Sequence, residues 1–367
     1  MTIQFSNYIP EFVATRRFLH QNPELGLSEF KTSDFLADQL TALGYEVTRG
    51  LGQTGLVASL KNGTSGRSIG IRADIDALPI PEETGLDYAS QNPGLMHACG
   101  HDGHTAILLG AARILAERRN FDGTLNLIFQ PAEENFAGAK LMIEDGLFRQ
   151  FPCDAVFGLH NDPSIPFGKI AVREGAMLAA ADECVITIQG RGGHGAEPQN
   201  ACDPIVCGAS IIMALQTIVS RNLHAMDQAV ITVGAFNAGK ASNVIPELAQ
   251  MALTVRSFDQ SVRDMLEKRI REVAEGQAAS YGMSVSITYD RGYEPTINHK
   301  AETDFVRDVA RRVVGRDNVF DLARPMMGSE DFAFMLQARP GAYIMIGNGE
   351  TAALHNPAYD FNDEAIA

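Results

Sequence analysis

An alternation of strands and helices in the first half of the chain constrains the fold most strongly. Residues 68–74 (SIGIRAD) are typical of a buried strand, and residues 104–119 carry apolar side chains at helical spacing. Further strands are predicted over 124–130 and 155–160. Because this order is typical of parallel strands joined by helices, we expect an α/β fold with a doubly wound, mostly parallel sheet.

The pattern changes near residue 176 and changes back near residue 292. Between these points the predicted elements follow the order β-α-β-β-α-β, which is typical of a ferredoxin-like unit. Strands are predicted over 182–190, 229–236, 249–258 and 284–290, and helices over 203–222 and 261–282. We expect residues 176–291 to form an inserted α+β domain, and residues 1–175 plus 292–367 to form the main domain.

Charge and composition exclude several classes of function. The 367 residues include 45 acidic and 30 basic side chains, and a net charge of −15 without a basic patch disfavours nucleic acid. We find no segment that is apolar over the roughly 18 residues of a membrane span. The start, MTIQFSNYIPEF, lacks the basic and apolar regions of a secretion signal. We therefore expect a cytoplasmic protein that binds neither nucleic acid nor membranes, and a mature secreted form stays open as the alternative.

The five cysteines do not form a recognisable framework. Their number is odd and no CxxC pair is present, which argues against paired disulfides and against a structural zinc knuckle. We expect most of them to be buried, reduced thiols.

Residues 50–55 (GLGQTG) match the GxGxxG pattern of dinucleotide-binding proteins. That pattern requires a helix directly after the glycines, whereas the following residues, GLVASL, are strand-like. A glycine-rich hairpin is the better interpretation.

Metal-capable side chains gather where the predicted strands end and where the helix over 104–119 begins. In an open α/β sheet, ligands bind beyond the carboxyl ends of the strands. Taken singly, each such residue also fits a hydrogen-bonded structural role or a buried thiol. Together they would be costly to pack without a cation, and they are typical ligands of divalent transition metals. The set comprises Asp74, Asp76, His97, Cys99, His101, Asp102, His104, Glu133, Glu134, His160 and His355.

The adjacent pair Glu133 and Glu134 indicates a division of roles. Neighbouring side chains on an extended backbone point in different directions, so that one carboxylate can bind metal while the other faces a water molecule. A metal lowers the pKa of its water, and a nearby carboxylate can then transfer the proton to a leaving amine. This pair suits the hydrolysis of an amide.

Motifs along nearly the whole chain resemble those of the M20 metallopeptidase superfamily. The resemblance is to its amidohydrolase branch, which includes hippurate hydrolases, N-acyl-amino-acid deacylases and plant auxin-conjugate hydrolases. The motifs are RRFLHQNPELGLSEFKT (16–32), IRADIDALPI (71–80), MHACGHDGH (96–104), FQPAEE (129–134), GLHNDP (158–163), GGHGAEP (192–198), SNVIPE (242–247), GSEDF (328–332) and LHNPAYDFND (354–363).

The resemblance implies a metal site with two ions and Glu133 as the general base. It further implies that the inserted domain is a lid whose His194, Asn243 and Arg256 contact the substrate carboxylate or the developing oxyanion. The metal ligands that it implies are Cys99, His101, Glu134, His160 and His355.

Other interpretations of the lid residues remain open. His194 lies in a glycine-rich turn that lets the backbone approach another surface. Arg256 could clamp a carboxylate through two hydrogen bonds, but an arginine on a strand is often a surface ion pair. Asn243 fits a turn residue equally well. His20, in the first motif, fits a structural role better than a catalytic one.

One motif departs from that of other branches of the superfamily. Where those relatives have HxD, this chain has Asp74, Ile75 and Asp76. A histidine ligand is therefore replaced, and Cys99 is a candidate for the missing ligand. Asp76 could instead orient a ligand histidine from behind.

The sequence predicts a metal-dependent amidohydrolase that cleaves N-acyl amino acids of the hippurate type into a carboxylic acid and a free amino acid. Two other functions remain open: a dipeptidase or aminopeptidase on the same scaffold, and a metal-dependent binding protein without turnover. The expected cofactor is a divalent transition metal, two ions per chain, chosen from manganese, zinc, nickel and cobalt. The chain could also form a homodimer or a larger homo-oligomer.

Overall fold

The computed structural model describes residues 8–367 and divides them into two units. Unit 1 comprises the chain up to Met177 together with Ile297–Arg324 and Asp331–Ala367. Unit 2 comprises Leu178–Thr296 and Pro325–Glu330. The first seven residues, part of the segment in which no secretion signal is predicted, lie outside the described residues.

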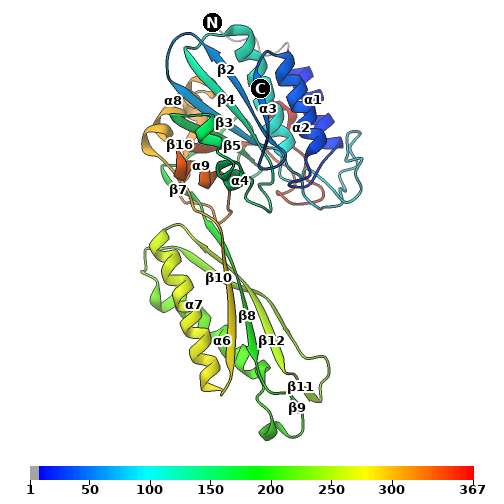
Figure 1. The fold of residues 1–367 in the computed structure, drawn as a ribbon, viewed down its shortest axis with the longest axis vertical. Coiled ribbons are helices and arrows are strands. Elements are labelled where there is room, and N and C mark those ends of the chain that lie inside the picture. The colour runs from blue at the N-terminus through cyan, green and yellow to red at the C-terminus, as the bar shows by residue number, and fades with distance from the viewer. Residues whose placement is uncertain (1–7) are drawn as a thin grey trace. The chain divides into compact units, whose positions relative to one another are not determined.

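Unit 1 is built on an eight-stranded mixed sheet in the order β1-β2-β4-β3-β5-β16-β6-β15 (Figure 1). The central strands β4, β3, β5 and β16 run parallel, as do β6 and β15, whereas β1, β2 and β4 form antiparallel pairs and β16 pairs antiparallel with β6. The predicted fold class is confirmed, with antiparallel pairs added toward both edges. The strand bounds are β1 Glu46–Leu51, β2 Gly55–Asn62, β3 Ser68–Asp74, β4 Gly123–Gln130, β5 Ala155–Asp162, β6 Ile170–Val172, β15 Val319–Asp321 and β16 Gly341–Gly347.

Helices cover both faces of this sheet because its strands alternate their side chains. Leu127 and Phe129 of β4 pack in one core with α2 and α3, whereas Gln130 bonds to Asp331 beside α9. The helices of unit 1 are α1 Ile9–Gln21, α2 Phe30–Ala42, α3 His101–Arg118, α4 Gly138–Glu144, α5 Leu147–Gln150, α8 Lys300–Val314 and α9 Phe332–Ala338.

The segment GLGQTG is the turn of a β-hairpin. Strands β1 and β2 pair antiparallel through it, with Leu51 opposite Gly55. Gly50 and Gly52 have φ values of 87° and 59°, a region that glycine enters without steric cost. The hairpin interpretation is confirmed, because a strand follows where the dinucleotide pattern would need a helix.

Unit 2 has the predicted β-α-β-β-α-β order. Its four-stranded sheet has the order β10-β12-β8-β13, and all its pairs are antiparallel. Helices α6 and α7 pack on the sheet around Ile188, Ile211, Leu215, Leu266 and Ile270. The elements are β8 Ala180–Gln189, α6 Pro204–Thr217, β10 Ala229–Ala238, β12 Leu248–Ser257, α7 Gln260–Ser280 and β13 Ser284–Tyr293, with the π-helix η3 Ile218–Asn222 continuing α6.

Two features of unit 2 differ from the sequence prediction. Residues 325–330, assigned by the sequence pattern to the main domain, group with unit 2 because the Ala179 amide donates to Gly328 O at 2.8 Å. In addition, Pro204–Asn222 is long and apolar enough to cross a membrane by length and composition alone, so the expectation that no such segment exists is wrong. Its inner side chains, such as Cys207 and Ile211, pack in the core of unit 2.

Candidate metal centre

The strands of unit 1 carry the candidate metal ligands to one edge of the sheet. Asp74 ends β3, and His160 lies near the end of β5. His101 begins α3, directly after Gly100, whose φ of 88° turns the chain into the helix. Glu133 and Glu134 follow β4 by three and four residues, so four separate elements contribute to one site.

Three overlapping groups of side chains bring the sequence-predicted residues together. Within each group the possible ligand atoms lie within 4.8 Å of one another. The groups share members, so the five predicted ligands and Glu133 form one cluster. The groups are Cys99, His101 and His160; Cys99, Glu134 and His355; and His101, Glu133 and Glu134.

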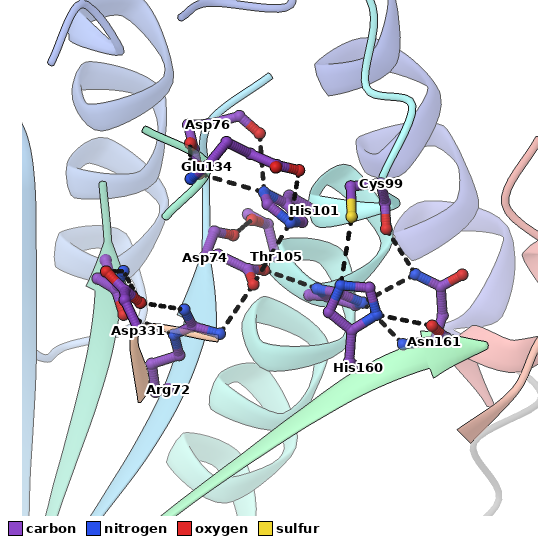
Figure 2. Close-up of polar contacts among 12 residues, drawn as sticks. Arg72, Asp74, Asp76, Cys99, His101, Thr105, Glu134, His160, Asn161 and Asp331 are labelled. Atoms are coloured by element: carbon purple, nitrogen blue, oxygen red, sulfur yellow. Dashed lines mark hydrogen bonds and ion pairs between the residues drawn. The ribbon is translucent and has the colours of Figure 1, made fainter. Parts of the chain in front are cut away.

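His101 has the arrangement expected of a metal-binding histidine. Its Nδ1 lies 2.9 Å from Asp76 O and 3.1 Å from Asp76 Oδ1 (Figure 2). Its Nε2 is buried and has no hydrogen-bond partner among the described residues. Because a buried polar atom without a hydrogen bond is costly, this nitrogen fits a cation in the cluster, with Asp76 fixing the orientation of the ring through Nδ1.

The charges around His101 favour a cation. Burial lowers the pKa of His101, but the carboxylates of Asp74 and Asp76 outweigh it and raise the pKa to about 10. Burial and the charges of Glu134 and Glu133 raise the pKa of the Cys99 thiol well above its usual value. The cluster therefore has a surplus of acidic groups. A bound cation would compensate their negative charge and would allow the Cys99 thiol to ionise.

Cys99 and Glu134 each face a histidine. The Cys99 Sγ lies 3.4 Å from His160 Nε2, while His160 Nδ1 donates to Asn161 O at 2.6 Å. Glu134 Oε1 lies 3.2 Å from His355 Nε2. Burial raises the pKa of Glu134, but the hydrogen bond from His355 and the charge of His101 lower it below its ordinary value. Glu134 is thus an anion that can bind metal.

His104 does not have a free ligand atom, although the sequence places it with the candidate ligands. Its Nδ1 donates to Asp74 Oδ1 at 2.6 Å, and its Nε2 accepts from the Asn161 amide at 3.0 Å. Both nitrogens are occupied, so His104 connects β3 to β5 next to His160.

Arg72 is a residue of the site that the sequence analysis did not identify. It is buried in β3, where it donates to Asp74 Oδ2 at 2.8 Å and to Asp331 Oδ1 at 3.1 Å (Figure 2). A basic residue in the middle of a mostly apolar strand, SIGIRAD, was the available signal, since a buried arginine needs anionic partners.

In unit 2, His194 lies on a short two-stranded sheet, and Asn243 directly precedes the second strand of that sheet. Strand β9 (Gly193–His194) pairs with β11 (Val244–Ile245), and the Gly195 amide donates to Asn243 O at 2.8 Å. The Ala196 amide donates to His194 Nδ1 at 3.0 Å. This bond places the proton of a neutral His194 ring on Nε2, so the exposed imidazole presents an N–H donor.

Arg256 lies on β12 of unit 2. Its guanidinium donates to Thr254 Oγ1 at 3.2 Å and to Ser329 Oγ at 3.1 Å, and within residues 8–367 it makes no ion pair with a carboxylate. The alternative of a surface ion pair is therefore not observed, and the fork of N–H donors keeps its charge available for an anion.

Comparison with protein families identifies the chain. The model of peptidase family M20/M25/M40 matches residues 70–367. The chain belongs to this family. The resemblance seen in the sequence motifs is thereby confirmed.

Several known proteins are similar to this chain over almost its whole length. The hippurate hydrolase of Campylobacter jejuni is 45% identical over 97% of this chain and 93% of its own length. The N-acetyl-L-cysteine deacetylase of Bacillus subtilis is 41% identical over 99% of this chain and 86% of its own. A crystal structure of the Bacillus subtilis YXEP protein, described as a dinuclear metal binding peptidase from the M20 family, has a TM-score of 0.86 at 35% identity and covers 98% of this chain and 95% of that one.

Proposed function

We propose that this protein cleaves the amide bond of N-acyl amino acids, of which hippurate is the model, giving a carboxylic acid and a free amino acid. The observation that carries the proposal is the buried His101 Nε2, which has no hydrogen-bond partner among the described residues and lies in a cluster with the carboxylates of Glu133 and Glu134. The similarity to a hippurate hydrolase and to an N-acetylcysteine deacetylase supports the substrate class.

Cys99, His101, Glu134, His160 and His355 would hold two divalent ions. When bound, such ions polarise the substrate carbonyl and acidify water. The thiolate of Cys99 favours zinc, nickel or cobalt, and manganese remains a candidate because metal availability can override affinity. The YXEP protein, described as dinuclear, supports the number of ions.

Glu133 is the proposed general base. It is 6% exposed and belongs to the same group as His101 and Glu134, so its carboxylate lies within reach of a water molecule in the cluster. Glu133 accepts a proton from the attacking water and then donates it to the leaving nitrogen. Asp76 supports this arrangement by accepting the Glu134 amide at 3.0 Å.

The roles proposed for unit 2 follow from the donors that it presents. The Nε2–H of His194 stabilises the developing oxyanion, because a fixed N–H donor acts most strongly where charge appears in the transition state. Arg256, which makes no ion pair within residues 8–367, binds the substrate carboxylate, and Asn243 near His194 provides a further amide contact.

The cellular setting and the assembly are further proposals. A cytoplasmic protein fits the surplus of acidic residues and the five free cysteines. A homodimer is supported by the exposed apolar side chains of α6, Ile205, Val206 and Met213.

A hydrolysis panel tests the proposed function. The protein, reconstituted with each of the four metals, is offered N-benzoyl, N-acetyl and long-chain N-acyl amino acids, with free-amino dipeptides as the comparison. We expect cleavage of the acylated compounds and loss of turnover in Glu133→Gln with its metal retained. Faster hydrolysis of dipeptides would favour a peptidase, and full turnover by metal-loaded Glu133→Gln would contradict the assignment of the base.

A further inference from the structure

A second buried carboxylate holds the turn that carries Glu133 and Glu134. Glu29 Oε1 accepts the Ala132 amide at 2.8 Å, and Glu29 Oε2 accepts the Thr54 hydroxyl at 2.6 Å. Glu29 is fully buried and belongs to none of the candidate metal groups found within residues 8–367. Thr54 lies in the hairpin turn of the GLGQTG segment, which has no role in the proposed reaction.

The turn over residues 131–134 has a backbone that needs support. Ala132 has a φ of 53°, in the left-handed region that is strained for a residue with a Cβ. The chain also packs closely here. A Cβ on Gly26 would lie 3.0 Å from Ala132, and a Cβ on Gly138 would lie 1.7 Å from Pro131 O. The turn therefore fits between two glycines and is fixed by its hydrogen bonds.

The two amides on either side of Glu133 are held by different carboxylates. Asp76 accepts the amide of Glu134 at 3.0 Å, and Glu29 accepts the amide of Ala132. Since Ala132 and Glu134 precede and follow Glu133, the two carboxylates together fix the backbone from which the Glu133 side chain extends.

The Glu29 side chain does not cap the helix α2 that follows it. It is the N-cap residue of α2, but its side chain makes no capping bond to that helix. Glu24 instead accepts the Thr32 amide at 2.9 Å in the first turn of α2. Burial raises the pKa of Glu29 to about 7, although the Thr54 hydrogen bond opposes the shift. A carboxyl group buried at this cost, and turned away from its own helix, points to a role at the turn.

We propose that Glu29 is a positioning residue for the catalytic base, acting through the Ala132 amide to set the place of the Glu133 carboxylate. This inference rests on the proposed function, in which Glu133 transfers the proton. In this proposal the GLGQTG hairpin contributes Thr54, whose hydroxyl group holds the Glu29 carboxylate in place.

The test compares Glu29→Ala and Glu29→Gln with Glu24→Ala as the matched control, all in the metal-loaded full chain with N-benzoylglycine. Three quantities are measured: kcat and KM, metal content, and hydrogen–deuterium exchange of the peptide over 131–136. Glu29→Ala should lower kcat about 10- to 100-fold, as small misplacements of catalytic groups do, with KM and metal content nearly unchanged and faster exchange over 131–136. Glu29→Gln should recover most of kcat, since one amide oxygen can still accept the Ala132 amide.

Glu24→Ala should lower the melting temperature while leaving kcat and the exchange over 131–136 unchanged. The inference is overturned if Glu29→Ala keeps its kcat, loses metal in proportion to activity, or behaves like Glu24→Ala. If Glu29→Ala does not fold, Thr54→Val serves in its place and should lower kcat and speed the same exchange, and unchanged exchange would overturn the inference. Absence of turnover in the unmodified protein would refute the proposed function instead, and the exchange comparison would still decide the role of Glu29.

Discussion

The two units present their functional side chains in opposite ways. In unit 1 the side chains of His101 and Asp76 are buried and bonded to each other. In unit 2 His194 is exposed on a two-residue strand, and Arg256 is half-buried with two hydroxyl partners. The difference indicates that the candidate ligands of unit 1 are held by hydrogen bonds to one another, at a cost in buried charge, whereas unit 2 presents N–H donors to solvent or to hydroxyl groups.

Removal of metal should have the largest effect and should act on unit 1. Dialysis against a chelator is expected to abolish turnover, by at least about 10³-fold, since the metal activates the carbonyl and water. Stability should fall as well, because ligand binding at 1,000 times Kd stabilises by about 4 kcal/mol. Hydrogen exchange with and without metal should differ around Cys99 and His160 and not in the sheet of unit 2. Equal changes in both units would contradict the comparison.

His194→Ala should come next, with an effect on rate alone. Loss of one oxyanion donor costs about 10²–10³ in kcat in known cases. Since the imidazole is exposed, the melting temperature and the metal content should stay unchanged. A variant with normal kcat would remove His194 from the mechanism, and one with a large loss of stability would contradict the exposed role assigned to it.

Asp76→Ala, in unit 1, should change metal binding, in contrast to His194→Ala, which should change only the rate. Removal of the partner of a ligand histidine typically lowers metal affinity 10- to 100-fold. Here the same change also frees the Glu134 amide. Competition with a chelator measures the affinity, and Asp154→Ala is the control, because Asp154 accepts the Ser68 amide away from the metal cluster. Unchanged affinity would show that Asp76 does not orient His101.

The smallest expected effect concerns pH and the buried charges behind the cluster. Burial lowers the pKa of His20, but the charge of Asp102 at 2.8 Å and a hydrogen bond to Glu82 raise it to about 9. Because the folded-state pKa lies above the unfolded value near 6.5, the stabilisation is complete below pH 6.5 and is lost as pH rises through 9.

His20→Asn should therefore lower stability by about 1–3 kcal/mol at pH 6.5 and by much less at pH 9.5. Urea unfolding at both pH values provides the measurement. His224→Asn, at an exposed position of unit 2, is the control and should change little at either pH. A difference that does not depend on pH would mean that His20 is not charged in the folded protein.

The sequence predicted elements and chemistry better than it predicted orientation. Hydrophobic spacing located β3, β4, β5 and α3, and the residues after them were the right ones to examine. It could not show that both nitrogens of His104 are occupied, or that Glu29 turns away from its own helix to reach Ala132. These contacts join residues about 30 to 100 positions apart, so no local pattern encodes them.

Chain connectivity limited the prediction in a second way. Residues 325–330 group with unit 2, although the sequence around them continues the pattern of unit 1. The backbone bond between Ala179 and Gly328 that holds this segment leaves no trace in side-chain composition. Among the residues that the prediction missed, Arg72 could have been found from the sequence, because it is a basic residue within a mostly apolar strand.

The optical spectrum of the cobalt-substituted protein tests the central claim most directly, since it reports whether Cys99 and its neighbours bind the catalytic metal ions. We predict a sulfur-to-cobalt charge-transfer band in the near ultraviolet that disappears in Cys99→Ser and weakens in His160→Ala. A wild-type spectrum without such a band, in protein that nevertheless binds cobalt and hydrolyses N-benzoylglycine, would contradict the account.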